Sequence, residues 1–354
     1  LQETMDLCLS CKACKSECPS NVDMAKLKSE VLQIKYDQQG VPRRDKMIRD
    51  SALMASRMSG AMAPLVNAVT HSSLGRFFID KVSGFDQRRK LPAFARQSFA
   101  QWYENNYRTP SETDKTVILF ADTYLNYHEP AVGIAATQLL SACGYGVQLA
   151  AVGCCQRPRI SHGFLRLAKV EGEKTAMGLV ELLHDGAKIV VCEPSCASAL
   201  VDDLPDLLHD QSLGQRLQEN IQMLDVFLAS ELDAGKIASL TNVTDTRLLL
   251  HGHCHQKALF GTAHLKRVFE GLTGLSVEEI ASGCCGMAGS FGYEKEHYEV
   301  SKKIGEQILF PAVRESNAET KIIADGFSCR HQIEHFTDRK AKHWVEVMWD
   351  IVGG

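Results

Sequence analysis

The sequence lacks several features that would assign it to a broad class of protein. No apolar run approaches the ~18 residues that a membrane-spanning helix needs, and no signal-peptide pattern stands at the N-terminus. Basic residues are not in excess, because 39 Lys and Arg stand against 43 Asp and Glu, for a net charge of −4. This balance gives no electrostatic case for nucleic acid as a partner. We therefore expect neither a transmembrane segment nor a nucleic-acid partner.

Cysteine is the residue type that the sequence uses unusually. There are 13 in a chain of 354 residues, an odd number in a protein too large to need disulfide staples. Two pairs are adjacent, Cys154–Cys155 and Cys284–Cys285, and adjacent cysteines bridge each other only in a strained ring. Clustered thiols in a reducing compartment are typical of metal ligands. We expect a cytoplasmic protein, with a peripheral position at the inner membrane as the alternative.

The first cysteine cluster, "CLSCKACKSECP", has the spacing C-x2-C-x2-C-x3-C-P and contains Cys8, Cys11, Cys14 and Cys18. In two-cluster ferredoxins, the first three thiolates of such a run hold one [4Fe–4S] cluster and the fourth ligates the other. This chain has a single copy of the run. We therefore predict that Cys18 points toward a cluster whose other ligands lie outside this sequence, and that the chain alone holds its N-terminal cluster poorly. A zinc knuckle is the alternative.

The segment after this run predicts helices. Asn21 is placed to cap a helix that Gly40 and Pro42 end. Its apolar residues are Met24, Leu27, Val31 and Ile34. From residue 45 to about residue 107 the pattern stays helical, with four methionines on roughly one face: Met47, Met54, Met58 and Met62. We interpret them as a core-facing stripe, and a deformable docking surface is the alternative.

From Thr116 onward, runs rich in Val, Ile and Leu alternate with helical stretches, which predicts parallel sheets covered on both faces. The pattern then repeats. "GVQLAAVGCCQ" matches "LSVEEIASGCCG", and "AKIVVCEPSC" matches "TKIIADGFSC". The offset is nearly constant, since Cys154 aligns with Cys284 and Cys196 with Cys329. The sequence therefore predicts a duplicated α/β domain.

Four cysteines of the second copy follow predicted strands, where open parallel sheets place their ligand sites. They are Cys254, Cys284, Cys285 and Cys329. The turns lead into helix N-termini, whose partial positive charge favours thiolates. Glycines around the adjacent pair allow the backbone to approach an inorganic group closely. A dinucleotide-binding loop is the alternative, although the spacing is G-x-x-G-x-x-G rather than G-x-G-x-x-G.

Three histidines alternate through "HGHCHQ", and on a strand His251, His253 and His255 would share one face. We interpret them as hydrogen-bonding groups beside the site, and a mixed Cys/His site is the alternative.

The first copy has a weaker set of cysteines: Cys154, Cys155 and Cys196, with Cys192 nearby. Asp122 and Thr123 stand where the second copy has Cys254. We interpret this site as vestigial or non-standard, and a cluster with an incomplete ligand set is the alternative.

Together these motifs resemble a known family. The "GCC" motif followed by "EPSC" or "GFSC" is similar to the duplicated cysteine-rich (CCG) domain of the B subunit of heterodisulfide reductase, glycolate oxidase iron–sulfur subunits and the C subunit of anaerobic glycerol-3-phosphate dehydrogenase. The stretches Met5–Glu30, "LLLHGHCHQKAL" and "GCCGMAGSFGYEKEHYEVS" look closer to one subgroup. These are the C-terminal iron–sulfur portions of FAD-linked dehydrogenases of D-2-hydroxy acids such as D-lactate and D-2-hydroxyglutarate.

The resemblance implies an α/β fold of two pseudo-duplicated parallel-sheet CCG domains, preceded by a helical segment and half of a ferredoxin-like cluster motif. The implied domains are 1–40 (cluster motif and following helix), 41–112 (helical segment), 113–235 (first CCG-type domain, with a degenerate site) and 236–354 (second CCG-type domain). The implied [4Fe–4S] ligands are Cys8, Cys11, Cys14 and Cys18, and the implied ligands of the CCG-type site are Cys254, Cys284, Cys285 and Cys329. The B subunit of heterodisulfide reductase uses five cysteines per site, and here Gly326 stands where one of them would be.

By resemblance, the chain is the iron–sulfur electron-transfer module of a flavin-dependent oxidoreductase. It would relay electrons from reduced FAD, formed in D-2-hydroxy-acid oxidation, to an external acceptor. No flavin-binding motif or catalytic residue is identified in the chain, which begins at Leu1 rather than Met, so we expect FAD on an upstream domain or partner subunit. Two alternatives stay open: a metal-stabilised docking module without redox activity, and a disulfide reductase acting at the CCG cysteines.

Overall fold

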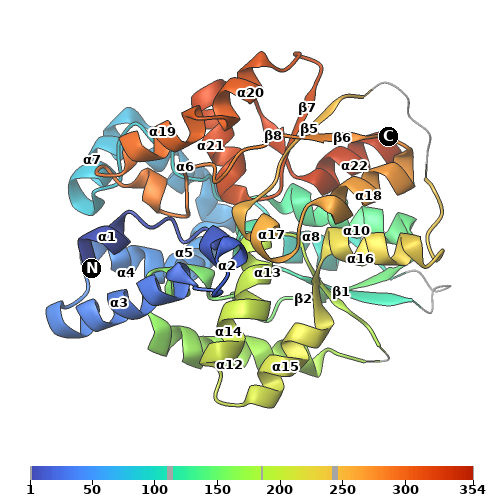
Figure 1. The fold of residues 1–354 in the computed structure, drawn as a ribbon, viewed down its shortest axis with the longest axis horizontal. Helices are drawn as coiled ribbons and strands as arrows, with labels where there is room; N and C mark the ends of the chain where they lie inside the picture. Colours follow the sequence, from blue (N-terminus) through green and yellow to red (C-terminus); the bar gives the residue numbers. More distant parts are fainter. Residues whose placement is uncertain (1, 110–114, 185, 241–245, 354) are drawn as a thin grey trace.

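The computed structural model describes residues 2–109, 115–184, 186–240 and 246–353 (Figure 1). Two four-stranded sheets carry the duplication. The first contains β1 (Thr116–Phe120), β2 (Gly146–Ala150), β3 (Ile189–Val191) and β4 (Ile221–Met223) in the order β2-β1-β3-β4. The second contains β5 (Leu248–His251), β6 (Val277–Glu279), β7 (Lys321–Ala324) and β8 (Ala341–Lys342) in the order β6-β5-β7-β8.

All the strand pairs in both sheets are parallel, and the two strand orders coincide when β5 is matched to β1. In the central strand β1, Val117 to Phe120 are buried, as expected of a strand covered by helices on both faces. The predicted α/β fold with two pseudo-duplicated parallel-sheet units is confirmed.

Helices connect the strands in each unit. Those of the first unit are α9 (Thr123–Tyr127), α10 (Pro130–Ala142), α11 (Arg157–Ser161), α12 (Leu165–Glu181), α13 (Pro194–Ser198), the π-helix η2 (Ala199–Asp203), α14 (Leu204–Leu207), α15 (Gln211–Asn220) and α16 (Leu224–Asp233). Those of the second unit are α17 (Cys254–Leu259), α18 (Ala263–Thr273), η3 (Phe291–Tyr293), α19 (Tyr298–Glu306), α20 (Leu309–Glu315), α21 (Phe327–Thr337) and α22 (Trp344–Val352).

One hydrophobic cluster contains residues of both units and lies between them. Helix α10 packs against α22 and α16 against α18, so each unit contributes one helix to each of these contacts. Leu139, Leu228, Phe269 and Trp344 lie in this shared core and are almost fully buried. Burial of large apolar side chains is the main stabilising contribution to such an interface. The two sheets are therefore held in a fixed relation to each other.

The N-terminal region is helical. Its elements are α1 (Gln2–Asp6), α2 (Ala13–Glu17), α3 (Met24–Gln39), α4 (Arg43–Arg49), α5 (Ser51–Met58), η1 (Gly60–Met62), α6 (Ala63–His71), α7 (Ser73–Ser83) and α8 (Phe99–Asn106). The prediction of continuous helical pattern from 45 to 107 is wrong for residues 84–98, which are almost entirely irregular. This stretch contacts the second unit instead, where the Asp86 amide donates to the Tyr293 carbonyl.

Two details of α3 differ from the prediction. Asp23, not Asn21, caps the helix, because its carboxylate accepts from the amides of Ala25 and Lys26. The expected apolar face is also not the buried one, since Leu27 and Ile34 are exposed. Helix α3 packs against α11 and α12 through other residues, and Tyr36 stacks on Phe164 with ring centroids 5.2 Å apart.

The methionine stripe is not core. Met47, Met54 and Met58 are half-buried and Met62 is 51% exposed, so the interpretation as a core-facing stripe is wrong. Helix α4, which carries Met47, packs against α11, and α5, which carries Met54 and Met58, packs against α9. The predicted domain boundaries stay predictions, and the one at 112/113 lies outside the described residues.

Candidate metal centres

Four cysteines of the second unit meet at the carboxyl edge of its sheet. Cys254 begins α17 after β5, Cys284 and Cys285 lie on the loop after β6, and Cys329 is in the first turn of α21 after β7. Their thiols form a continuous row, in which Cys254 contacts Cys284, Cys284 contacts Cys285, and Cys285 contacts Cys329. We call these four residues the second-copy site. The structure brings together every cysteine that the sequence assigned to it.

The backbone turn that follows Cys284 and Cys285 directs an amide group at a sulfur atom. The Gly286 amide donates to Cys284 Sγ at 3.4 Å. Gly286 has φ +89°, and a Cβ atom there would lie 2.3 Å from the Ser301 carbonyl oxygen, so this turn requires glycine. An amide directed at a thiolate is a feature of iron–sulfur sites, where such bonds tune the potential.

The thiols of this site are held in their neutral form. The contact with Cys284 raises the pKa of Cys254 well above its ordinary value, and burial raises it further as the second cause. Metal binding requires thiolates, so loading the site must release protons. Soft, clustered thiolates suit iron–sulfur clusters or zinc. The residues present therefore fit the group that the resemblance implies.

The histidines do not share a strand face, because β5 ends at His251 and α17 begins at Cys254. His253 instead caps α17, and its Nδ1 accepts from the His255 amide at 3.1 Å. A Cβ atom on Gly326 would lie 2.2 Å from the His253 ring, so this ring fills the space that a side chain at position 326 would need.

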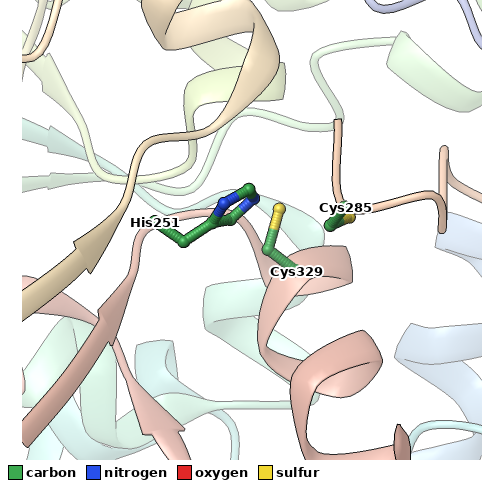
Figure 2. A group of neighbouring side chains, drawn as sticks. All are labelled: His251, Cys285 and Cys329. Atoms are coloured by element: carbon green, nitrogen blue, oxygen red, sulfur yellow. The ribbon is translucent and has the colours of Figure 1, made fainter. Parts of the chain in front are cut away.

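His251 is placed differently from the other two histidines. Its Nδ1 lies 2.8 Å from Ser282 Oγ, while its Nε2 is buried and has no hydrogen-bond partner among the described residues. Figure 2 shows the ring beside Cys285 and Cys329, and the ligand atoms of the three residues lie within 4.8 Å of one another.

The first unit holds a smaller group of thiols, which we call the first-copy site. Cys155 Sγ lies 2.8 Å from Cys196 Sγ, and Cys154 contacts both Cys155 and the Thr123 hydroxyl. Thr123 thus takes the place that Cys254 has in the second-copy site. Burial raises the pKa of Cys196 to about 12. Cys192 belongs to the core between the two units rather than to this group.

The N-terminal loop contains the four cysteines of the first motif, Cys8, Cys11, Cys14 and Cys18. Cys8, Cys11 and Cys14 lie close enough for electrostatic contact, and Cys11 is also near Cys254 of the second-copy site. The Met24 amide donates to Cys14 Sγ at 3.4 Å. The amides of Val22 and Ser20 lower the pKa of Cys18, whose own amide donates to the Cys14 carbonyl at 2.9 Å. The structure therefore brings Cys8, Cys11 and Cys14 close together in this loop.

Sequence reasoning missed the residue that anchors this loop. Lys12 is 1% exposed, and its Nζ lies 2.5 Å from Asp202 Oδ2 and 2.8 Å from Asp203 Oδ1. Arg157 also pairs with Asp203. The only available signal was a lysine between two cysteines, which does not indicate an acidic partner so distant in sequence. These ion pairs tie the loop to the first unit.

A duplicated parallel-sheet fold with thiols grouped at the strand ends defines a class of cysteine-rich α/β proteins. No model of a known protein family matches the chain. It is 29% identical over 320 residues to the C subunit of anaerobic glycerol-3-phosphate dehydrogenase from Escherichia coli K12, covering 89% of this chain and 78% of that protein.

Two further relatives come from the same organism. The chain is 24% identical to D-2-hydroxyglutarate dehydrogenase, with 99% of this chain matched to 35% of that protein. It is 22% identical to the glycolate oxidase iron–sulfur subunit, over 98% of this chain and 82% of that one. The chain is therefore homologous to components of dehydrogenases and oxidases, and the resemblance predicted from its motifs is confirmed. Among the described residues, no helix is long and apolar enough to span a membrane.

Proposed function

We propose that this chain is the electron-transfer module of a flavin-dependent oxidoreductase. It takes electrons from reduced FAD on another domain or subunit and passes them to an external acceptor. By likeness to D-2-hydroxyglutarate dehydrogenase, the electrons originate in the oxidation of a D-2-hydroxy acid. The name of the glycolate oxidase iron–sulfur subunit supports iron–sulfur clusters as the cofactors. Such clusters supply reversible one-electron transfer when bound.

The observation that carries the proposal is that two groups of thiols adjoin. Cys11 of the N-terminal loop is near Cys254 of the second-copy site, and α2 packs against α17 near the centre of Figure 1. Two adjoining sites are what a relay requires, whereas a docking module needs no second metal site beside the first. Burial of Cys285 and Cys329 also argues against a disulfide reductase, whose substrate must reach the sulfur atoms.

In this proposal the protein holds the sites and sets their environment. Cys8, Cys11 and Cys14 would hold a [4Fe–4S] cluster, with Cys18 directed to ligands supplied from outside the chain. Cys254, Cys284, Cys285 and Cys329 would hold the second group. The first-copy site has three thiols and a hydroxyl, Cys154, Cys155, Cys196 and Thr123, and we propose that it is vestigial or non-standard.

We further propose that the chain associates peripherally with an anionic membrane. Helices α6 and α7 expose six large apolar side chains, which we call the apolar surface: Leu65, Val69, Leu74, Phe77, Phe78 and Val82. The charged side chains of the same two helices are mainly basic. Lys81 is exposed, Arg76 is half-buried, and the single acidic residue, Asp80, is buried and paired with Lys295. Apolar side chains flanked by basic ones are typical of interfacial helices.

Anaerobic purification of the full chain tests the relay. We expect iron and acid-labile sulfide in the protein, with a broad visible absorption that dithionite bleaches. Replacing Cys284 and Cys285 by serine should remove the part of the iron and of the absorption that belongs to the second-copy site. Cys143→Ala is the matched control, because Cys143 is a buried cysteine outside the three thiol groups. A colourless protein without iron, prepared under strict anaerobiosis, would contradict the proposal and favour the docking module.

A further inference from the structure

The buried ring of His251 presents an unpaired nitrogen to the second-copy site. Residue His251 is fully buried, and its Nε2 has no hydrogen-bond partner in the described part of the chain. A buried polar atom without a partner destabilises the folded state, because it has lost its bonds to water and gained none in return. Native proteins rarely leave such an atom without a role. The unpaired nitrogen therefore indicates a group that the site receives.

The direction of the ring is fixed from the opposite side. Nδ1 lies 2.8 Å from Ser282 Oγ, on the loop that leads to Cys284 and Cys285. When Nδ1 donates its proton to this hydroxyl, Nε2 carries a lone pair. An outer hydrogen bond of this kind sets the tautomer and orientation of metal-binding histidines. The serine thus prepares Nε2 to act as a ligand.

The sulfur atoms that Nε2 faces belong to the site. The ligand atoms of His251, Cys285 and Cys329 lie within 4.8 Å of one another, and all three residues are buried (Figure 2). The other two histidines of the motif use ring nitrogens in hydrogen bonds within the chain. His253 caps α17, and His255 binds Ser198 and Ser10 through its two ring nitrogens. Of the three, His251 is the one with a ring nitrogen that is fully buried and has no hydrogen-bond partner among the described residues.

We propose that His251 Nε2 is a ligand of the iron-containing group at the second-copy site, alongside Cys254, Cys284, Cys285 and Cys329. This inference rests on the proposed function. It makes the site a mixed Cys/His centre rather than an all-thiolate one. A neutral imidazole adds no negative charge to the cluster, whereas a thiolate does, so the reduction potential should be higher than that of an all-cysteine site.

Pulsed EPR on the full chain, purified anaerobically with ¹⁵N-labelled histidine, tests the assignment. We expect a strong ¹⁵N hyperfine coupling in the reduced wild-type protein. The coupling should disappear in His251→Gln and persist in His343→Gln. His343 is the matched control, because it is equally buried and both of its ring nitrogens are already hydrogen-bonded, to the Val345 amide and the Cys192 carbonyl.

A second variant covers the case in which His251→Gln fails to fold. His251→Cys supplies a donor that carries charge, so it should retain iron, lose the ¹⁵N coupling and have a lower reduction potential than the wild type. An iron-loaded wild-type protein without the coupling overturns the assignment while leaving the relay intact. An unchanged potential in iron-loaded His251→Cys also overturns it. A protein without iron contradicts both the assignment and the proposed function.

Discussion

His255 Nε2 lies 2.8 Å from the carbonyl oxygen of Ser10, across 245 residues of sequence. A carbonyl oxygen can only accept, so Nε2 donates, and Nδ1 of the neutral ring accepts from the Ser198 hydroxyl at 2.8 Å. Burial lowers the pKa of His255 well below its ordinary value, which keeps the ring neutral. One side chain thus ties the N-terminal cysteine loop to both sheet units.

His255→Phe should loosen the N-terminal loop. Phenylalanine preserves much of the ring volume but leaves the Ser10 carbonyl without its donor, at a cost of about 1–3 kcal/mol. We expect faster release of iron from the N-terminal motif to a chelator, with the iron of the second-copy site retained. Ser198→Ala leaves the bond to the Ser10 carbonyl in place, although it also removes the contacts of Ser198 Oγ with Arg157 and the Ser195 carbonyl, and it should release the N-terminal iron more slowly than His255→Phe. Equal release rates for His255→Phe and the wild type would contradict this role.

Lys12→Met should be strongly destabilising. The buried Nζ contacts two carboxylates, Asp202 and Asp203, and each of them would lose its buried lysine partner. Removing one partner of a buried ion pair typically costs about 3–5 kcal/mol. The loss should appear as a lower denaturation midpoint in urea. Lys15→Met is the control, because Lys15 also pairs with Asp202 but is 28% exposed, and it should cost less than about 1 kcal/mol.

The sequence predicted the duplication well because its signals are local. The central strands are largely apolar runs, the cysteines of the second-copy site follow strands, and parallel topology then brings Cys254, Cys284 and Cys329 to one edge. What it could not predict depends on distant partners. The pairing of Lys12 with Asp202, or the position of His253 beside Gly326, is set only when the two units and the N-terminal loop pack together.

The predicted buried face of the surface helix α3 was the other error. The spacing of Leu27 and Ile34 on α3 is that of a buried face, yet the helix turns this face to solvent because Tyr36 and Ser29 make the contact. Periodicity gives the angle between apolar side chains but not which side of the helix meets the rest of the protein.

Cys18 should be the first cysteine to react in the iron-free protein. The thiolate is the reactive form, and the amides of Val22 and Ser20 lower the Cys18 pKa, whereas burial raises that of Cys196 to about 12. Mass spectrometry after brief treatment with iodoacetamide near neutral pH should find Cys18 modified well before Cys196. The difference should shrink in urea, because unfolding removes both shifts. Preferential labelling of Cys196 in the native protein would contradict this order.

Asp225→Asn should stabilise the iron-free protein above pH 6. Burial raises the pKa of Asp225 from 3.8 to about 6, so the folded state retains a proton that the unfolded state releases. The free energy of unfolding therefore falls as pH rises between these values, and the loss is complete above the folded pKa. Asparagine still offers an oxygen to Gln256, and the variant should gain about 3 kcal/mol of stability at neutral pH and little at pH 4. Urea titrations across this range would measure the change.

The control for this titration is Asp233→Asn in the same helix. Asp233 is exposed and forms a surface ion pair with Arg267, which contributes little to stability. Its substitution should therefore shift the denaturation midpoint by a similar small amount at every pH. A gain in Asp225→Asn that is independent of pH would show that the carboxyl group is not the cause.

Leu74→Glu combined with Phe78→Glu should abolish binding to anionic vesicles. Leu74 is 68% and Phe78 58% exposed, so neither change disturbs the core, and both add negative charge to a basic region. Wild-type protein should sediment with vesicles that contain phosphatidylglycerol, less so with phosphatidylcholine alone, and less at high salt, because screening weakens the attraction of lysine and arginine. Val170→Glu is the control, since Val170 is 54% exposed on α12, away from the apolar surface. If the wild-type protein binds neither kind of vesicle, the apolar surface does not bind a membrane. The flavin-binding partner would then be the next candidate to test for binding to this surface.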